Sequence, residues 1–272
     1  MRRKKHDSII GYGNSRSNLC RVIANMSKYY GVKCCIISPK DDDGQRVETS
    51  NSKIVRLCDS EIVICSKDNV SKTVSETISR HKDAGYSPYY IYGNEFGTGN
   101  KSTPVNAYYK CYNEILSQAK AYDLDFDYIF LATGTGMTQA GLLSGKLVSN
   151  GKEKIVGISV ARKTEQETNV IYDYVKSFFK KKQLNTNILK DDICVVDEYI
   201  GKGYGKKSSI IDKAIYDMMV LNGIPLDPTY TGKAFLGMRD YIIKNNISNK
   251  NVLFIHTGGT PLFFDNLRNV KW

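Results

Sequence analysis

Short apolar runs rich in β-branched residues alternate along the chain with amphipathic segments. After a first short run at Ile9 and Ile10, such runs bounded by turn residues predict strands at Lys33–Ser38, Glu61–Cys65, Tyr89–Tyr92, Tyr128–Thr133, Lys154–Ser159, Ile193–Val196 and Asn251–His256. Helical periodicity between them predicts helices at Ser15–Tyr30, Val70–Ala84, Pro104–Tyr122, Thr138–Val148, Thr164–Lys181, Ser208–Asn222 and Lys233–Asn245. Because the runs are apolar throughout, we expect strands buried on both faces in an α/β fold with an open, mostly parallel sheet.

A glycine-rich polar segment, Gly93–Thr103, interrupts this alternation. Pro104 then begins a new helix, since proline is favoured in the first helical turn. We therefore predict two domains, a small α/β domain at 1–92 and a large α/β domain at 93–272.

The composition is that of an ordinary globular protein. The chain has 272 residues, of which 41% are hydrophobic and 25% are charged. No apolar run approaches the roughly 20 residues of a membrane span. The apolar stretch after the basic residues at the start is limited to Ile9 and Ile10, far short of the roughly 7–15 residues of a secretory signal. We expect a cytoplasmic protein with no membrane partner.

The formal net charge is +11, from 39 basic and 28 acidic residues. Such a surplus is compatible with a basic nucleic-acid-binding domain, which salt-sensitive binding to DNA would reveal. The basic residues are scattered, however, and the dense runs Arg2–Lys5 and Lys180–Lys182 are typical of solvated tails and helix ends. We therefore expect no nucleic-acid partner.

Metal ligands and common nucleophiles show no recognisable spacing. The seven cysteines form no CxxC pair and lie mostly in apolar runs, which predicts buried free thiols in a reducing compartment. The three histidines, His6, His81 and His256, form no paired ligand motif, and no GxSxG segment occurs. Asp41–Gly44 lacks most positions of a calcium loop and is typical of a solvated turn. We expect no metal site, and we interpret His256 as a partly buried structural residue.

The most specific local signal follows the predicted strand Tyr128–Thr133. Gly134-Thr135-Gly136-Met137-Thr138 leads from this strand into a helix. A strand that turns through glycines into a helix N-terminus directs backbone N–H groups and the positive end of the helix dipole at an anion, usually a phosphate. The alternative is an ordinary tight turn with Thr138 as the helix N-cap. The spacing is not the GxGxxG dinucleotide fingerprint.

Four further turns carry candidate chemistry. Ser17 and Asn18 lie at a helix N-terminus and can hold a carboxylate through hydroxyl, amide and main-chain N–H groups, although simple capping explains them as well. Tyr204 in GKGYG and Tyr230 in LDPTYTGK lie in glycine-containing loops, where packing alone rarely requires an aromatic ring. The fourth turn, Ile255–Pro261, lies at the end of the last predicted strand.

Taken in order, these segments resemble the fold-type II pyridoxal phosphate enzymes of the D-cysteine desulfhydrase and 1-aminocyclopropane-1-carboxylate deaminase group. The resemblance covers about Ile9 to Phe264 and rests on GNSRSN, TGTGMT, GYG, DPTYTGKA and HTGG, of which DPTYTGKA is the most specific. It implies two open, mostly parallel twisted sheets flanked by helices. It also implies pyridoxal 5′-phosphate as the cofactor, a small amino acid as the substrate and a homodimer as the assembly.

The resemblance implies roles for particular residues. Ser17 and Asn18 match the family's GGxQSN turn, which binds the substrate carboxylate and flanks the cofactor ring, although Leu19 stands where a polar residue is common. Tyr230 matches the active-site tyrosine, so Tyr230 and Ser17 are the implied catalytic residues. The implied cofactor-binding residues are Asn18, Thr133, Gly134, Thr135, Gly136, Thr138, Tyr204, Thr257 and Gly258. The implied substrate-binding residues are Ser17, Asn18, Tyr204, Tyr230 and Thr231.

One family feature is missing from the sequence. Family members carry the Schiff-base lysine in an Asn-Lys-x-Arg-like motif about one strand and one helix before the serine–asparagine turn. Here only 16 residues precede Ser17, Lys4 and Lys5 lack the motif, and Lys233 occupies a different family position. The resemblance therefore implies a large domain that is incomplete at its N-terminus, with the lysine segment lost, encoded upstream of Met1 or carried by a separate polypeptide.

The implied activity is the breakdown of a small amino acid to an oxo acid and ammonia, with sulfide released when the substrate is D-cysteine. In the family, a threonine after the active-site tyrosine accompanies D-cysteine breakdown, whereas a glutamate accompanies cyclopropane ring opening; here the residue is Thr231. Because the lysine anchors the cofactor and manages the proton at carbon, we expect this chain alone to be inactive. The alternative is a non-catalytic small-molecule-binding protein on the same scaffold.

Overall fold

The computed structural model describes residues 6–40, 47–206 and 208–267. Lys4 and Lys5 of the first basic run and the acidic turn at 41–44 lie outside the described residues. The chain divides into two compact units, unit 1 at Met1–Asn100 and unit 2 at Lys101–Trp272. This division lies near the end of the glycine-rich segment 93–103. The boundary predicted from the sequence, between residues 92 and 93, lies at the start of the same segment.

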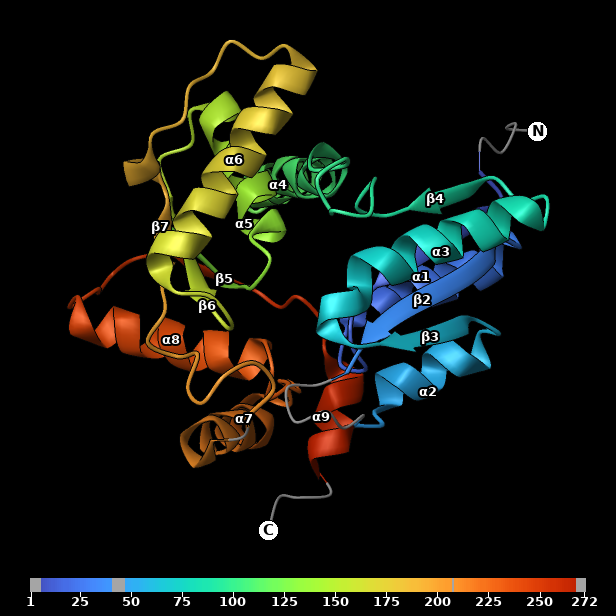
Figure 1. The fold of residues 1–272 in the computed structure, drawn as a ribbon. Coiled ribbons are helices and arrows are strands. Elements are labelled where there is room, and N and C mark those ends of the chain that lie inside the picture. The colour runs from blue at the N-terminus through green and yellow to red at the C-terminus, as the bar shows by residue number, and fades with distance from the viewer. Residues whose placement is uncertain (1–5, 41–46, 207, 268–272) are drawn as a thin grey trace. The chain divides into compact units, whose positions relative to one another are not determined.

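Unit 1 is an open parallel sheet with helices on both faces (Figure 1). Its described residues form four strands in the order β3-β2-β1-β4, at Ser8–Tyr12 (β1), Lys33–Pro39 (β2), Glu61–Cys65 (β3) and Pro88–Tyr90 (β4). Its helices are α1 (Asn18–Tyr30), α2 (Ser50–Leu57) and α3 (Val70–Asp83), with a 3-10 turn at Lys67–Asn69. Successive residues of β2 face opposite sides, so Cys34 packs with α1 and α2 whereas Cys35 packs with α3.

Unit 2 repeats this arrangement on a larger scale. Its described residues form a second four-stranded sheet in the order β7-β6-β5-β8, from Tyr128–Thr133 (β5), Lys154–Ser159 (β6), Cys194–Val196 (β7) and Val252–Ile255 (β8). Its helices are α4 (Ser102–Ala121), α5 (Met137–Ser149), α6 (Thr164–Lys182), α7 (Ser209–Asn222), α8 (Thr231–Lys244) and α9 (Thr260–Leu267), with a 3-10 turn at Lys190–Asp192. Leu131 of β5 packs toward α4, α5 and α6, whereas Phe130 faces α8.

The strand order reverses at β1 in unit 1 and at β5 in unit 2. Every pairing between described strands is parallel, and in each sheet the first strand has the next strand on one side and the last strand on the other. In open α/β sheets, ligands bind beyond the carboxyl ends of the strands where the order reverses. This rule places a ligand at the loop after β1 and at the loop after β5.

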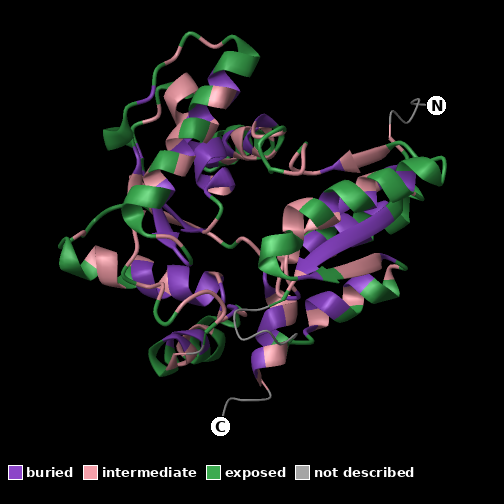
Figure 2. Cartoon of the chain, in the orientation of Figure 1, coloured by how far each residue is buried: buried purple, intermediate pink, exposed green. Residues whose placement is uncertain are grey.

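The predicted fold class, two open parallel sheets flanked by helices, is confirmed. Burial on both faces holds for the central strands β2, β5 and β6, which are purple in Figure 2. For β3, β7 and β8 the expected full burial is wrong, because these strands form sheet edges and are only partly covered. The sequence analysis missed α2 and α9, which are each eight residues long. Both helices are too short to show a clear helical period.

The cysteines are all free, and their burial varies along the chain. Cys20, Cys34, Cys35 and Cys65 are buried free thiols, as predicted, while Cys58, Cys111 and Cys194 are free and partly exposed. No helix within the described ranges is both long and apolar enough to cross a bilayer.

Candidate active site

The loop after β5 leads directly into the N-terminus of α5. The helix begins at Met137, and its N-cap is Gly136, which has a φ of 79° and provides no side-chain cap. The alternative that Thr138 caps the helix is wrong, because the left-handed turn at Gly136 starts the helix before Thr138 is reached. The first N–H groups of a helix have no partner within it, so this N-terminus offers backbone donors and a positive dipole to an anion.

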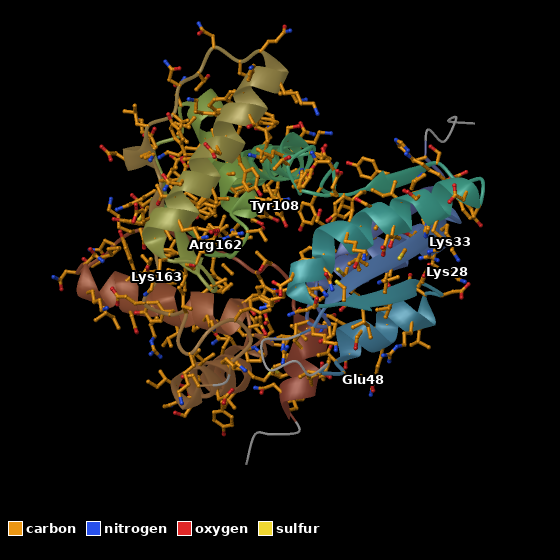
Figure 3. All side chains as sticks on the ribbon, viewed as in Figure 1. Lys28, Lys33, Glu48, Tyr108, Arg162 and Lys163 are labelled. Carbon is orange, nitrogen blue, oxygen red and sulfur yellow. The ribbon has the colours of Figure 1, made fainter. Side chains whose placement is uncertain are left out.

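A buried polar cluster supports this loop. Glu167 of α6 is fully buried; one carboxylate oxygen accepts a hydrogen bond from Thr133 Oγ1 (2.8 Å) and the other accepts one from Arg162 Nη1 (3.1 Å). Arg162, labelled in Figure 3, also donates to the carbonyl oxygen of Gly134 at 2.7 Å. Burial raises the pKa of the Glu167 carboxyl, and the two hydrogen bonds oppose that rise. The Thr133 hydroxyl is therefore hydrogen-bonded to Glu167, and this contact ties the end of β5 to α6 next to the loop.

The turn before α8 is organised around Asp227, whose side chain is fully buried. Its carboxylate accepts hydrogen bonds from the backbone N–H groups of Thr229 (2.8 Å), Tyr230 (2.8 Å) and Thr231 (3.0 Å). Burial raises the pKa of Asp227, and these hydrogen bonds oppose the rise. The turn fixes the backbone of Tyr230, the predicted catalytic tyrosine.

The structure places Thr231 inside the Asp227 turn. This residue has no exposed surface. Its hydroxyl donates to the Asp227 carboxylate at 2.8 Å and accepts from the Asp227 N–H at 2.8 Å. Because the hydroxyl both donates to and accepts from Asp227 inside the turn, Thr231 stabilises the segment that carries Tyr230.

Lys233 links α8 to the loop that carries Tyr204. Its side chain is fully buried, and Nζ donates to the carbonyl oxygens of Ile200 (2.7 Å) and Gly203 (3.0 Å). Burial lowers the pKa of the Lys233 ammonium, and the carboxylate of the preceding turn opposes that change. The hydroxyls of Tyr204 and Tyr230 share a hydrogen bond, with the ring centroids 5.7 Å apart and the rings at 72°. The structure thus brings together the two predicted tyrosines.

The turn after β8 packs against the Asp227 turn. A Cβ at Gly259 would lie 2.3 Å from an Asp227 carboxylate oxygen, so the two turns are in direct contact. His256 is exposed, which contradicts the expected partial burial, because the apolar strand ends one residue before it. Its Nδ1 accepts a hydrogen bond from the Gly258 N–H at 3.3 Å. Thr257 and Gly258 come after the carboxyl end of β8, the strand that pairs with β5.

In unit 1, the loop after β1 forms the start of α1. Ser17 is the N-cap, and its Oγ accepts a hydrogen bond from the Cys20 N–H at 3.2 Å. A Cβ at Gly13 would lie 2.8 Å from both Ser17 Oγ and Cys20 Sγ, so this close approach requires glycine. Asn18 Oδ1 accepts a hydrogen bond from Nδ2 of Asn51, a buried side chain of α2, at 2.9 Å. Capping therefore accounts for one contact of Ser17, while Asn51 orients Asn18.

This turn lines a small open recess within unit 1. The walls include Ser15 and Ser17 from the turn and Asn51 and Ser52 from α2. Ser15 Oγ is buried and makes no hydrogen bond with any described residue. Because an unpaired buried hydroxyl is costly, this position suits a polar ligand group such as a carboxylate. The sequence analysis missed Ser15, Asn51 and Ser52; the capping box of Thr49 with Ser52 was the available signal for α2.

Comparison with known proteins identifies the class of protein that this fold and these turns define. The pyridoxal-phosphate dependent enzyme family matches residues 2–258, nearly the whole chain. The chain belongs to this family, within the fold-type II group of 1-aminocyclopropane-1-carboxylate deaminases and D-cysteine desulfhydrases. The resemblance inferred from the sequence motifs is confirmed.

Individual relatives support this assignment. The chain is 32% identical over 263 residues to a putative 1-aminocyclopropane-1-carboxylate deaminase of Pyrococcus abyssi. The aligned region covers 95% of this chain and 76% of the relative. It is 27% identical over 267 residues to a D-cysteine desulfhydrase of Yersinia pestis, and this aligned region covers 96% of this chain and 79% of the relative. The crystal structure of an ACC deaminase homologue matches with a TM-score of 0.82 at 26% identity, covering 97% of this chain and 77% of that chain.

The described residues of unit 2 fit pyridoxal 5′-phosphate, the cofactor that family membership implies. No side chain of the described residues caps the start of α5, so its backbone N–H donors and the positive end of the helix dipole can bind a phosphate dianion. Tyr204, Tyr230 and Thr257 follow strands of the same sheet or start a helix packed on it. This donor set suits a phosphate and an aromatic ring, and the recess in unit 1 suits a carboxylate.

Proposed function

We propose that this chain carries the binding machinery of a D-cysteine desulfhydrase-like enzyme, which forms pyruvate, ammonia and sulfide from D-cysteine. The observation that carries the proposal is Thr231, since a threonine after the active-site tyrosine accompanies this activity in the family. In the structure, Thr231 completes the Asp227 turn and adds no second carboxylate beside Tyr230. Overall identity does not separate the two activities, because 1-aminocyclopropane-1-carboxylate deaminase relatives are 27% and 32% identical to the chain and the D-cysteine desulfhydrase relative is 27% identical.

The residues have distinct chemical tasks in this proposal. When bound, pyridoxal 5′-phosphate supplies the electron sink that weakens the bonds at the amino-acid carbon. The start of α5 at 136–138 holds the phosphate, and the recess with Ser15 and Ser17 holds the substrate carboxylate. The Tyr230 hydroxyl, paired with Tyr204, gives or takes a proton at the substrate.

Turnover in this family also needs the Schiff-base lysine. The Asn-Lys-x-Arg motif occurs nowhere in the 272 residues. Lys233 does not replace it, because its amine is buried and donates to two backbone carbonyls. We therefore propose that the 272-residue chain binds the cofactor without turning over until a lysine-bearing segment is supplied.

The second candidate function is a non-catalytic small-molecule-binding protein on the same scaffold. It is favoured by the glycine turn at the start of α5 together with a recess in which Ser15 Oγ has no partner among the described residues. The two functions differ in one outcome: supplying the lysine segment restores chemistry only to the enzyme.

Fusion of the chain to the N-terminal segment of the Yersinia pestis relative, which by resemblance carries the lysine, tests the proposal. We expect sulfide and pyruvate release from D-cysteine and poor turnover of 1-aminocyclopropane-1-carboxylate, measured as initial rates. Tyr230→Phe should lower sulfide release by about 100-fold or more, because a positioned acid–base group contributes about that much. Tyr241→Phe, a control in the same helix that loses only the contact with Lys154 Nζ, should leave the rate largely unchanged.

Comparable or faster turnover of the cyclopropane substrate would contradict the D-cysteine assignment. A fused protein that binds the cofactor and releases no sulfide would instead favour the non-catalytic binding function.

A further inference from the structure

Three potential metal ligands from different elements of unit 1 converge beneath α3. Cys35 lies on β2 and Glu61 on β3, and the two are partners in the parallel register. His81 lies in the last turn of α3. The thiol sulfur, a carboxylate oxygen and an imidazole nitrogen of these residues all lie within 4.8 Å of one another. Because the three residues are far apart in the sequence, ligand spacing did not reveal them, and the sequence analysis predicted no metal site.

The imidazole of His81 is oriented as a ligand would be. Its Nδ1 lies 2.6 Å from Ser8 Oγ on β1. Its Nε2 is buried, makes no hydrogen bond with any described residue, and lies 3.7 Å from Glu61 Oε2. The residue is only 3% exposed, so bulk water does not satisfy this nitrogen. An imidazole that is fixed through one nitrogen, and whose other nitrogen is buried, lacks a hydrogen bond and faces a carboxylate, is suited to bind a metal ion.

Glu61 is held from outside the cluster in a similar way. Its Oε1 accepts a hydrogen bond from Arg80 Nη2 at 2.6 Å, which leaves Oε2 as the oxygen nearer His81. The Glu61 side chain is 31% exposed, which gives the cluster a route to water. Arg80 and Lys33 are the cations that act on Cys35; Lys33 is labelled in Figure 3 at the start of β2. These cations oppose a metal ion, so the ligand atoms themselves must supply the affinity.

We propose that Cys35 Sγ, Glu61 Oε2 and His81 Nε2 bind one divalent cation of the zinc type, with water at the fourth position. Thiolate, imidazole and carboxylate are ligands that Zn²⁺ takes, at bond lengths of about 2.0–2.3 Å. Ligand atoms around such an ion lie about 3.5 Å apart, so side-chain shifts of about 1 Å close the cluster. Binding forms the sulfur–metal bond and releases the thiol proton to water.

This site is separate from the recess of unit 1. Cys35 and Glu61 lie near the amino ends of β2 and β3, whereas Ser15 and Ser17 follow the carboxyl end of β1 in the same parallel sheet. A bound cation would link β2, β3 and α3 and raise the thermal stability of the folded chain, by an amount that grows with the logarithm of the free cation concentration once this exceeds the dissociation constant.

Titration of the metal-free full-length chain with Co²⁺ tests the proposal. We expect one equivalent to bind with a sulfur-to-cobalt charge-transfer band in the near ultraviolet, and Zn²⁺ to displace it. Cys35→Ser and His81→Gln should each weaken binding by about 100-fold or more, and Ser8→Ala by about 10–100-fold, since partners of metal ligands have effects of that size. The matched control is Cys34→Ser, which changes the neighbouring buried thiol on the opposite face of β2 and should retain both binding and the band.

Circular dichroism of each variant separates lost binding from lost folding. If Cys35→Ser does not fold, Glu61→Gln decides the question, because it keeps the volume of a partly exposed side chain and should still weaken binding. The absence of saturable Co²⁺ binding, binding without the sulfur band, or unchanged binding by a folded Cys35→Ser or Glu61→Gln protein would overturn the proposal.

Discussion

Asp227→Ala is expected to destabilise the chain by about 3–5 kcal/mol, a large part of the stability of an ordinary domain. The substitution leaves the buried N–H groups of Thr229, Tyr230 and Thr231 without their acceptor, and each unpaired buried group costs about 1–3 kcal/mol. Removing a carboxylate that burial disfavours offsets part of this loss. Chemical denaturation monitored by circular dichroism measures the difference in unfolding free energy.

The control for this experiment is Asp217→Ala, which removes a surface ion pair with Lys213 and should change stability by only about 0.5 kcal/mol. The loss of stability for Asp227→Asn should lie between the losses for Asp227→Ala and Asp217→Ala. The amide retains one oxygen acceptor but turns an NH₂ group toward N–H donors. A loss for Asp227→Ala no larger than that for Asp217→Ala would show that the turn does not depend on this carboxylate.

Incubation of the 272-residue chain with pyridoxal 5′-phosphate, followed by borohydride, is expected to label no single lysine. D-cysteine should yield no sulfide above that of the buffer. The physical reason is that the sequence lacks the Asn-Lys-x-Arg motif and that Lys233, although close to the tyrosine pair, has its amine engaged by Ile200 and Gly203. Peptide mapping by mass spectrometry and a sulfide assay give the two readouts.

The Yersinia pestis relative serves as the positive control in the same assay, with one labelled lysine and sulfide release expected from the family resemblance. One dominant labelled lysine in this chain, together with measurable sulfide release, would contradict the prediction. That result would show that another lysine of this chain anchors the cofactor.

The sequence predicted those parts of the site that depend on neighbouring residues. A strand, a glycine turn and a helix start are local signals, so the loop at 134–138 and the turn at Ser17 could be found from the pattern alone. Even there, the helix start was placed at Thr138, because sequence does not show that Gly136 adopts the left-handed conformation.

The remaining parts depend on contacts between distant residues. Glu167 meets Thr133 and Lys233 meets Gly203 across about 30 residues, and no local pattern indicates such pairs. The contacts of Thr231 could not be predicted for the same reason, since its hydroxyl pairs with Asp227 inside a turn that depends on the fold. Ser15 was missed together with α2, whose eight mostly polar residues give no apolar stripe.

The start of α5 is expected to bind the phosphate of pyridoxal 5′-phosphate. Equilibrium dialysis of the cofactor against the wild-type chain, Gly136→Ala and Gly223→Ala tests it most directly. Both glycines have positive φ, 79° and 69°, but Gly223 follows α7 with nothing within 4 Å of an added Cβ. We predict saturable wild-type binding that inorganic phosphate displaces, an affinity about 10-fold lower for Gly136→Ala because the loop is strained, and unchanged affinity for Gly223→Ala. Equal affinities for wild type and Gly136→Ala, or no saturable binding by the wild-type chain, would contradict the claim.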